Sequence, residues 1–165
     1  MLTQLAPRLG CPNIVVSLTT AGSLGPELRS AGVPVLALGM KRGRPSLAAI
    51  FRLRNIIKRE RPTLLQTWLY HADLLGLVTS FFLHDVPVVW NLRCSDLDLS
   101  KYSFDTRAVR WLSARVSSLP AAIVVNSEAG RLSHEAIGYR AKRWELIPNG
   151  FDTELFQPDA AARAR

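Results

Sequence analysis

Six short runs rich in Val, Ile and Leu divide the chain and predict β-strands. They fall at 13–18, 33–38, 63–68, 87–92, 121–126 and 144–147. Most of these runs are almost continuously apolar, which is typical of parallel strands covered on both faces, whereas a half-exposed antiparallel strand would alternate. The pattern therefore predicts the strands of a parallel sheet.

Segments with helical periodicity separate these runs. In 46–61 the apolar positions recur on one helical face, at Leu47, Ile50, Phe51 and Ile57. Pro45 fits a first helical turn, and Pro62 should end the helix. Thr106 and Ser127 are suited to cap two further helices. The first of these should bury Ala108, Trp111, Leu112 and Leu119, and the second should end at Gly138.

The alternation of strands and helices predicts an α/β fold of the Rossmann-like type, a parallel sheet with helices on both faces. The segment before the first run looks like a helix, with Leu2, Leu5, Ala6 and Leu9 as its apolar positions and no strand before it. In a sheet of order 3-2-1-4-5-6 the first strand is central, so its absence would leave two neighbours unpaired. We therefore expect residues 1–150 to form one domain, truncated at its start and lacking its first strand.

Composition narrows the class of protein. A length of 165 residues and 48% apolar content suit a single domain with a hydrophobic core. Cys11 and Cys94 have neither metal-ligand nor redox spacing, and no secretory signal precedes them, so we expect reduced, buried thiols in the cytosol. The strongly apolar, uncharged run at 74–83 has only ten residues and is too short to span a bilayer.

The net charge of +8 is uneven along the chain. Residues 41–61 hold eight Lys and Arg against Glu60 alone, a local balance of +7. Such a basic helix can bind nucleic acid, contact anionic lipid or form a solvated face, and the solvated face is the most common of the three. Exposed aromatics do not alternate with these cations and no recognition motif occurs, so we expect no nucleic-acid partner.

The last strand of the pattern, 144–147, runs into Pro148 and then Asn149 and Gly150. Proline cannot donate to a sheet ladder, and Asn-Gly tolerates positive φ, so a tight turn is expected there. Ligands of open α/β sheets bind at the carboxyl ends of the strands. This turn is therefore expected to belong to a binding site.

Four segments together resemble a known family. They are QTWLYHAD at 66–73, VVWNLR at 88–93, IVVNSEA at 123–129, and IPNGFD at 147–152 followed by Phe156 and Pro158. In order and spacing, over nearly the whole chain, they are similar to the amino-terminal domain of retaining family-four glycosyltransferases, which have two Rossmann domains (the GT-B fold).

The resemblance implies transfer of a sugar from a nucleotide-sugar donor to a saccharide or lipid-linked acceptor, in the synthesis of cell-surface polysaccharide or lipopolysaccharide. Relatives hold most donor contacts in a second Rossmann domain, which these residues do not contain, so this domain should be inactive alone. Residues 151–165 would begin the interdomain linker. The implied place is the cytoplasm, with peripheral attachment at the inner, anionic face of the plasma membrane.

The resemblance and the strand ends select the same candidate site residues. His71 and Asp73 are suited to bind acceptor hydroxyls. Alternatively, Asp73 interacts with the positive end of a helix and His71 is a packed core residue. Asn126, Ser127, Asn149 and Gly150 are further substrate-binding candidates, although for Ser127 a helix cap is favoured over ligand contact.

Arg93 is the candidate catalytic residue, because a guanidinium with five donors can hold a phosphate or stabilise its charge. Many relatives have a histidine near this place, so a catalytic role does not transfer directly, and an ion pair with Asp96 or Asp98 is the alternative.

The site's chemistry is expected to need no cofactor. No His, Cys or carboxylate cluster has metal-ligand spacing, so we expect a metal-independent reaction in which basic side chains and helix amino termini stabilise the leaving diphosphate. The competing interpretations are a non-catalytic basic module that binds nucleotide or nucleic acid, and an inactive gene fragment.

Overall fold

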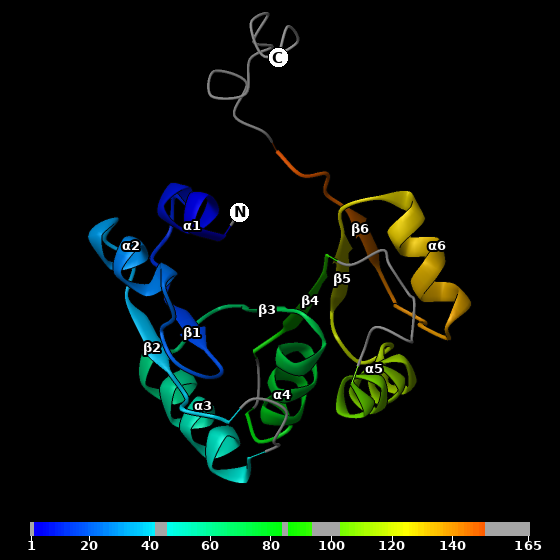
Figure 1. Cartoon of the computed structure of the whole chain (residues 1–165), viewed down its shortest axis with the longest axis horizontal. Helices are drawn as coiled ribbons and strands as arrows, with labels where there is room; N and C mark the ends of the chain where they lie inside the picture. Colours follow the sequence, from blue (N-terminus) through cyan, green and yellow to red (C-terminus); the bar gives the residue numbers. More distant parts are fainter. Residues whose placement is uncertain (1, 42–45, 84–85, 94–102, 151–165) are drawn as a thin grey trace, which may run out of the picture.

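Helices and strands alternate along the protein in a computed structural model that describes residues 2–41, 46–83, 86–93 and 103–150 (Figure 1). The strands are β1 (Val15–Ser17), β2 (Val35–Ala37), β3 (Leu65–Trp68), β4 (Val88–Leu92), β5 (Ala122–Val125) and β6 (Trp144–Leu146). The helices are α1 (Leu2–Leu5) with the 3-10 turn η1 (Ala6–Arg8), α2 (Leu24–Ser30), α3 (Leu47–Glu60), α4 (Tyr70–Ser80), α5 (Phe104–Val116) and α6 (Glu128–Ala136). All described strand pairs are parallel, which confirms the predicted α/β class.

The six strands form two sheets. β1 pairs with β2, and the other sheet has the order β3-β4-β5-β6. No ladder joins β1 to β3 in the described residues, although these two strands face each other across the middle of the fold (Figure 1). The six predicted strands are therefore divided between two parallel sheets. The gap lies between β1 and β3, the two strands expected from the sequence to flank the absent central strand. A strand forms a ladder only with a partner about 4.8 Å away, and β1 and β3 do not pair with each other.

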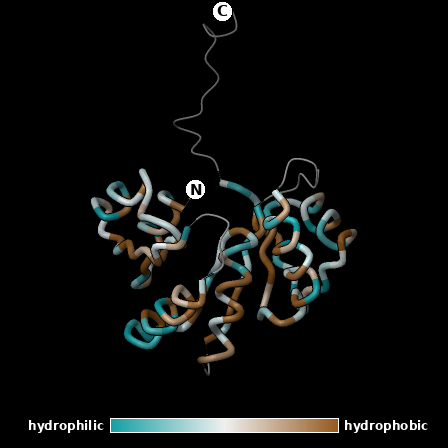
Figure 2. Tube along the Cα trace, turned by 60° about the horizontal axis from the view of Figure 1, so that its bottom comes forward, coloured by the Kyte–Doolittle hydropathy of each residue, from teal (hydrophilic) through white to brown (hydrophobic). Residues whose placement is uncertain are grey.

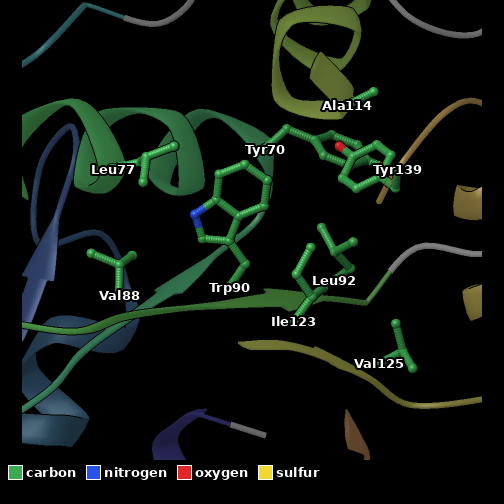
Figure 3. Packing of buried hydrophobic residues seen from close by; sticks show 9 residues of the cluster. All are labelled: Tyr70, Leu77, Val88, Trp90, Leu92, Ala114, Ile123, Val125 and Tyr139. Carbon is green, nitrogen blue, oxygen red and sulfur yellow. The ribbon is translucent and has the colours of Figure 1, made fainter. Parts of the chain in front are cut away.

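The larger sheet carries the main hydrophobic core. Side chains of β4 and β5 pack against α4 and α5, with Trp90 and Ile123 completely buried (Figure 3). Tyr139, which follows α6, lies edge-on to Trp90 with ring centroids 6.4 Å apart. In Figure 2 the strands of this sheet are mostly hydrophobic and lie in the interior, whereas apolar and polar residues alternate along the helices. This core sets the positions of the strand ends described below.

Two smaller clusters complete the interior. Ala6 and Leu28 pack with β2 beneath the amino-terminal helices. The other cluster holds Leu53 and Ile57 of α3 and reaches partly buried side chains of both β1 and β3, including Leu65. Side-chain packing under α3 therefore joins the two sheets where backbone hydrogen bonds do not.

Two predicted helix starts agree with the structure and one does not. Ser46 accepts a hydrogen bond from the Ala49 amide and caps α3, which begins at Leu47; Pro45, predicted to lie in the first turn, is outside the described residues. Ser127 caps α6 by accepting from the Gly130 amide at 3.0 Å. Thr106 is not an N-cap, because α5 begins two residues earlier, at Phe104.

The buried faces of α3 and α5 differ from the prediction. In α3 the buried side chains are Ala49, Leu53 and Ile57, whereas Leu47 and Phe51 are 76% and 58% exposed. In α5 the buried positions are Arg110, Ser113 and Ala114. The side chains expected to be buried there, Ala108, Trp111 and Leu112, are all exposed, as is Leu119, which lies beyond the end of α5. Periodicity identified both helices, but the surface each helix meets decides which stripe is buried.

Cys11 is an exposed free thiol, so the expectation that it is buried is wrong; it lies in the link between η1 and β1 and not in a strand. Cys94 lies outside the described residues. No helix among the described residues has the length and apolar character needed to cross a membrane.

Candidate active site

Arg93 connects three strand ends at the carboxyl edge of the larger sheet. Directly after β4, its Nε donates to the Asn91 side-chain oxygen at 2.6 Å. Its Nη1 donates to the Asn149 side-chain oxygen at 2.8 Å and to the Ile147 carbonyl at 3.4 Å, both after β6. The guanidinium carbon lies 5.2 Å from the ring centroid of Trp68, the last residue of β3.

The strand register explains this convergence. Trp68 is level with Asn91, and Leu92 is level with Val125, which is in turn level with Leu146. The strands therefore end at one edge. Because β5 lies between β4 and β6, the long side chain of Arg93 must cross the end of β5 to reach Asn149. Two of the predicted site residues, Arg93 and Asn149, are therefore joined at this edge by a hydrogen bond.

The surroundings of Arg93 suit an anion. Partial burial lowers the pKa of the guanidinium from its ordinary value, but an arginine remains charged at any physiological pH. Contact with the Trp68 face offsets part of the lost hydration. Among the residues described, Nη2 has no hydrogen-bond partner. Asp96 and Asp98, its alternative partners, lie outside these residues.

His71 lies on the surface near this edge. Its side chain is 40% exposed, and Nε2 lies 4.0 Å from a carboxylate oxygen of Asp105 in α5. The alternative interpretation, that His71 is a packed core residue, is therefore wrong. No hydrogen bond joins His71 to Arg93 in the described residues. Its role in acceptor binding stays a prediction.

Asp73 is completely buried, one turn into α4. Its Oδ1 accepts a hydrogen bond from the Thr67 hydroxyl at 2.5 Å. Burial raises the pKa of Asp73 to about 8, against the lowering effect of hydrogen bonds from Thr67 and the Asn91 backbone. The carboxyl is therefore largely protonated at neutral pH. This corrects the expectation of an accessible carboxylate that binds a substrate, because the packed interior leaves no part of Asp73 exposed to solvent.

The remaining candidates differ in exposure. Ser127 serves as the cap of α6, as favoured from the sequence, and Asn126 is half-buried beside it. Asn149 and Gly150 are exposed, but neither has positive φ and no turn is formed at 147–150. The predicted tight turn is therefore wrong within the described residues. Asn149 contributes to the site through its side-chain oxygen, which accepts a hydrogen bond from Arg93, and not through an unusual backbone conformation.

Two site residues were missed from the sequence. Asn91 is completely buried and accepts a hydrogen bond from Arg93. A single asparagine inside an apolar strand is only a weak indication of a site residue. Leu69 has φ 72° and ψ 153° at the start of α4, a region that is nearly restricted to glycine. No sequence pattern reveals a leucine in that conformation. It places a strained residue between Trp68 and Tyr70, at the edge of the site.

A buried histidine, also not singled out beforehand, connects α6 to α4. His134 Nδ1 donates to the Gly130 carbonyl at 2.7 Å, so Nε2 is left to accept from the Tyr70 hydroxyl at 3.0 Å. This tautomer follows from the carbonyl, which can only accept. Burial lowers the pKa of His134, so the ring is neutral and serves as a structural link behind the site.

Within the described ranges, no three His, Cys, Asp or Glu side chains come together to form a metal site. The expectation of a metal-independent reaction remains a prediction.

Parallel sheets flanked by helices, with a cation held at the carboxyl edge, define a Rossmann-like half domain of the GT-B type. The chain belongs to Glycosyltransferase Family 4, whose family model matches residues 1–155. This confirms the resemblance, and the chain is a glycosyltransferase-type domain. No curated protein and no solved structure matches it.

Proposed function

We propose that this domain forms the acceptor side of a retaining glycosyltransferase, which moves a sugar from a nucleotide-sugar donor to a saccharide or lipid-linked acceptor. The observation that supports this proposal most is the position of Arg93, which is held between Asn91 and Asn149 over Trp68 and has one terminal nitrogen without a partner among the described residues. A guanidinium in this position can bind the leaving diphosphate and stabilise the charge that develops on it.

The acceptor would lie beside this cation. His71 is half exposed at the start of α4, and a neutral imidazole can donate to or accept from a sugar hydroxyl. Asn149 is exposed and still has its side-chain NH₂ group as a donor. Asp73 has no part in this proposal, because it is buried.

Turnover would require a second, donor-binding domain. Sugar transfer needs donor and acceptor held within near-attack distance, and the residues described supply one wall of such a cleft. The 165-residue chain is therefore expected to be inactive alone. In the proposed setting, synthesis of cell-surface polysaccharide at the inner face of the plasma membrane, the cations of α3 attract the domain to anionic lipid.

Anion binding at Arg93 is the direct test. Pyrophosphate and UDP are titrated into the chain, and binding is followed by NMR chemical shifts. Arg93→Ala should weaken pyrophosphate binding at least about tenfold, because a charge-assisted contact is lost. Arg93→Lys should be intermediate, since the planar fork and the stacking on Trp68 are lost while the charge remains. The matched control is Arg143→Ala, which removes an arginine that is 72% exposed at the start of β6.

Equal binding by Arg93→Ala and wild type would overturn the proposed role of Arg93. Tight nucleotide binding by the chain alone, at a site indifferent to Arg93, would favour the non-catalytic nucleotide-binding module. The same samples are assayed with radiolabelled UDP- and GDP-sugars, and sugar transfer by the chain alone would contradict the need for a second domain.

A further inference from the structure

A basic pocket lies at the edge of the larger sheet opposite to Arg93. It has a volume of about 660 Å³, and its lining comes from the end of α3 and from the links that lead into β3 and β4: Arg54, Ile57, Lys58, Arg61, Pro62, Phe82, Leu83 and Val86. Because these links precede the strands, the pocket lies at the amino edge of the sheet. It is therefore separate from the candidate active site.

The pocket combines cations with apolar side chains. Arg54, Lys58 and Arg61 form its charged part, and none of their side chains has a hydrogen-bond or ion-pair partner among the described residues. Among the residues that the structure describes, no acidic side chain lines it; the Glu60 carboxylate accepts a hydrogen bond from Arg59 at 2.7 Å. An occupant with negative charge is therefore favoured at this surface.

The apolar part extends onto the outer surface. Phe82, in the pocket, is 54% exposed, and its neighbour Phe81 is 64% exposed. On α3, Phe51 is 58% exposed and lies one turn before Arg54 and two turns before Lys58, so the expectation that no exposed aromatic lies among these cations is wrong. Aromatic rings beside cations match the boundary between lipid headgroups and acyl chains, where the rings enter the apolar layer and the cations contact phosphate.

We propose that this end of the molecule rests on an anionic bilayer, with Phe81 and Phe82 in the headgroup layer and Arg54, Lys58 and Arg61 on lipid phosphates. The proposal rests on the membrane attachment included in the proposed function and adds an apolar component to it. A soluble anion or an acidic protein would use the cations but would not require two exposed phenylalanines.

Co-sedimentation of the full chain with vesicles tests this attachment. The vesicles contain phosphatidylcholine alone, or phosphatidylcholine with phosphatidylglycerol, in about 0.1 M and about 1 M NaCl, where the Debye length falls from roughly 10 to 3 Å. We expect binding to phosphatidylglycerol vesicles in low salt and a smaller, measurable amount in high salt. The high-salt binding reports the apolar contribution.

Two variants separate the apolar and charged contributions. Phe81→Ser with Phe82→Ser should remove most of the high-salt binding, a loss of at least about tenfold. Lys58→Glu should reduce low-salt binding at least about fivefold, because each cation near an anionic surface contributes a factor of that size. The matched controls, Phe104→Ser on α5 and Lys142→Glu before β6, should stay within about twofold of wild type. Circular dichroism and urea midpoints verify that each variant is folded.

Several results would overturn the proposal. If the Phe81/Phe82 variant binds vesicles as well as wild type does, the apolar contact is rejected. If the control variants lose as much vesicle binding as the test variants do, this end of the molecule is rejected as the membrane contact. Displacement from vesicles by millimolar inorganic phosphate assigns the pocket to a soluble anion. An absence of any vesicle binding rejects both this inference and the attachment by α3. Pyrophosphate binding at Arg93 is measured in the same variants and should not change, so failure here is distinguishable from failure of the proposed sugar transfer.

Discussion

The two-stranded and four-stranded parts of the fold are built from strands of similar apolar character but differ in how well they are covered. All three residues of β1 are only half-buried, whereas four of the five residues of β4 are fully buried. β1 has a partner on one side, and β4 is flanked by β3 and β5. An apolar run therefore predicts a strand, but its neighbours decide whether the strand is enclosed.

Buried polar groups show the same contrast. Every buried polar or charged side chain among the described residues lies between 67 and 134: Thr67, Asp73, Thr79, Asn91, Arg110, Ser113, Ser117 and His134. None lies in the part of 2–41 that forms the smaller sheet. Only the larger sheet, with α4, α5 and α6 around it, surrounds such groups with enough protein to hold them away from water.

The largest expected effect compares two leucines of equal burial. Leu92 and Leu28 are 2% and 3% exposed, in the large and the small sheet regions. Leu92→Ala should cost about 4 kcal/mol of unfolding free energy and Leu28→Ala about 2, because a small cluster near solvent can collapse around the lost volume. Urea denaturation measures both, with exposed Leu47→Ala as a control expected within about 0.5 kcal/mol of wild type. Equal losses would mean that both halves are equally enclosed.

The next prediction concerns Asp73, whose pKa is raised to about 8 in the folded state. As pH rises above about 4, the unfolded chain releases this proton first, so the folded state becomes less stable. Relative to Asp73→Asn, wild type should lose on the order of 1 kcal/mol per pH unit between about pH 5 and pH 8. Urea unfolding at several pH values measures the difference.

Asp105→Asn is the control for that series, because the pKa of Asp105 is lowered, mainly by a hydrogen bond from Ser103, and the group stays ionised over this range. A pH-independent difference between wild type and Asp73→Asn would show that Asp73 is ionised and therefore reached by water.

Hydrogen exchange tests the open edge between the sheets directly. The Val15 amide bonds to the Pro34 carbonyl of the strand pair, so the next amide, Val16, points toward the open side. The Ile123 amide, in the middle of the large sheet, bonds to the Arg143 carbonyl. We expect Val16 to be protected about a hundredfold less than Ile123, because its exchange needs only local opening. Similar protection would indicate that a strand or other partner covers β1.

The smallest effect is expected at Leu69. Glycine adopts the Leu69 conformation without strain, so Leu69→Gly should raise the unfolding free energy by up to about 1 kcal/mol despite its greater chain entropy. Leu64→Gly is the matched control: Leu64 is similarly exposed, has no positive φ, and should be destabilised by glycine. Thermal unfolding of both variants measures the contrast. A loss of stability in both would show that Leu69 is not strained.

The sequence alone determined the local structure of this protein. All six strands lie within the predicted ranges, and Ser127 caps its helix as predicted, because apolar runs and caps depend on nearby residues. Strand order also placed Arg93 and Asn149 at one edge, since parallel strands end together. The four motifs carried the family assignment.

The tertiary structure decided what depends on distant neighbours. The apolar period of α5 predicted a buried stripe through Trp111, but burial follows the surface that a helix meets, so Ser113 and Ala114 are buried while Trp111 remains exposed. The motif at 66–73 contains both His71 and Asp73, but the sequence could not show that the His71 imidazole lies on the surface while the Asp73 carboxyl is buried and protonated. Packing in the folded chain made that distinction, because only the folded chain removes water from one of the two side chains.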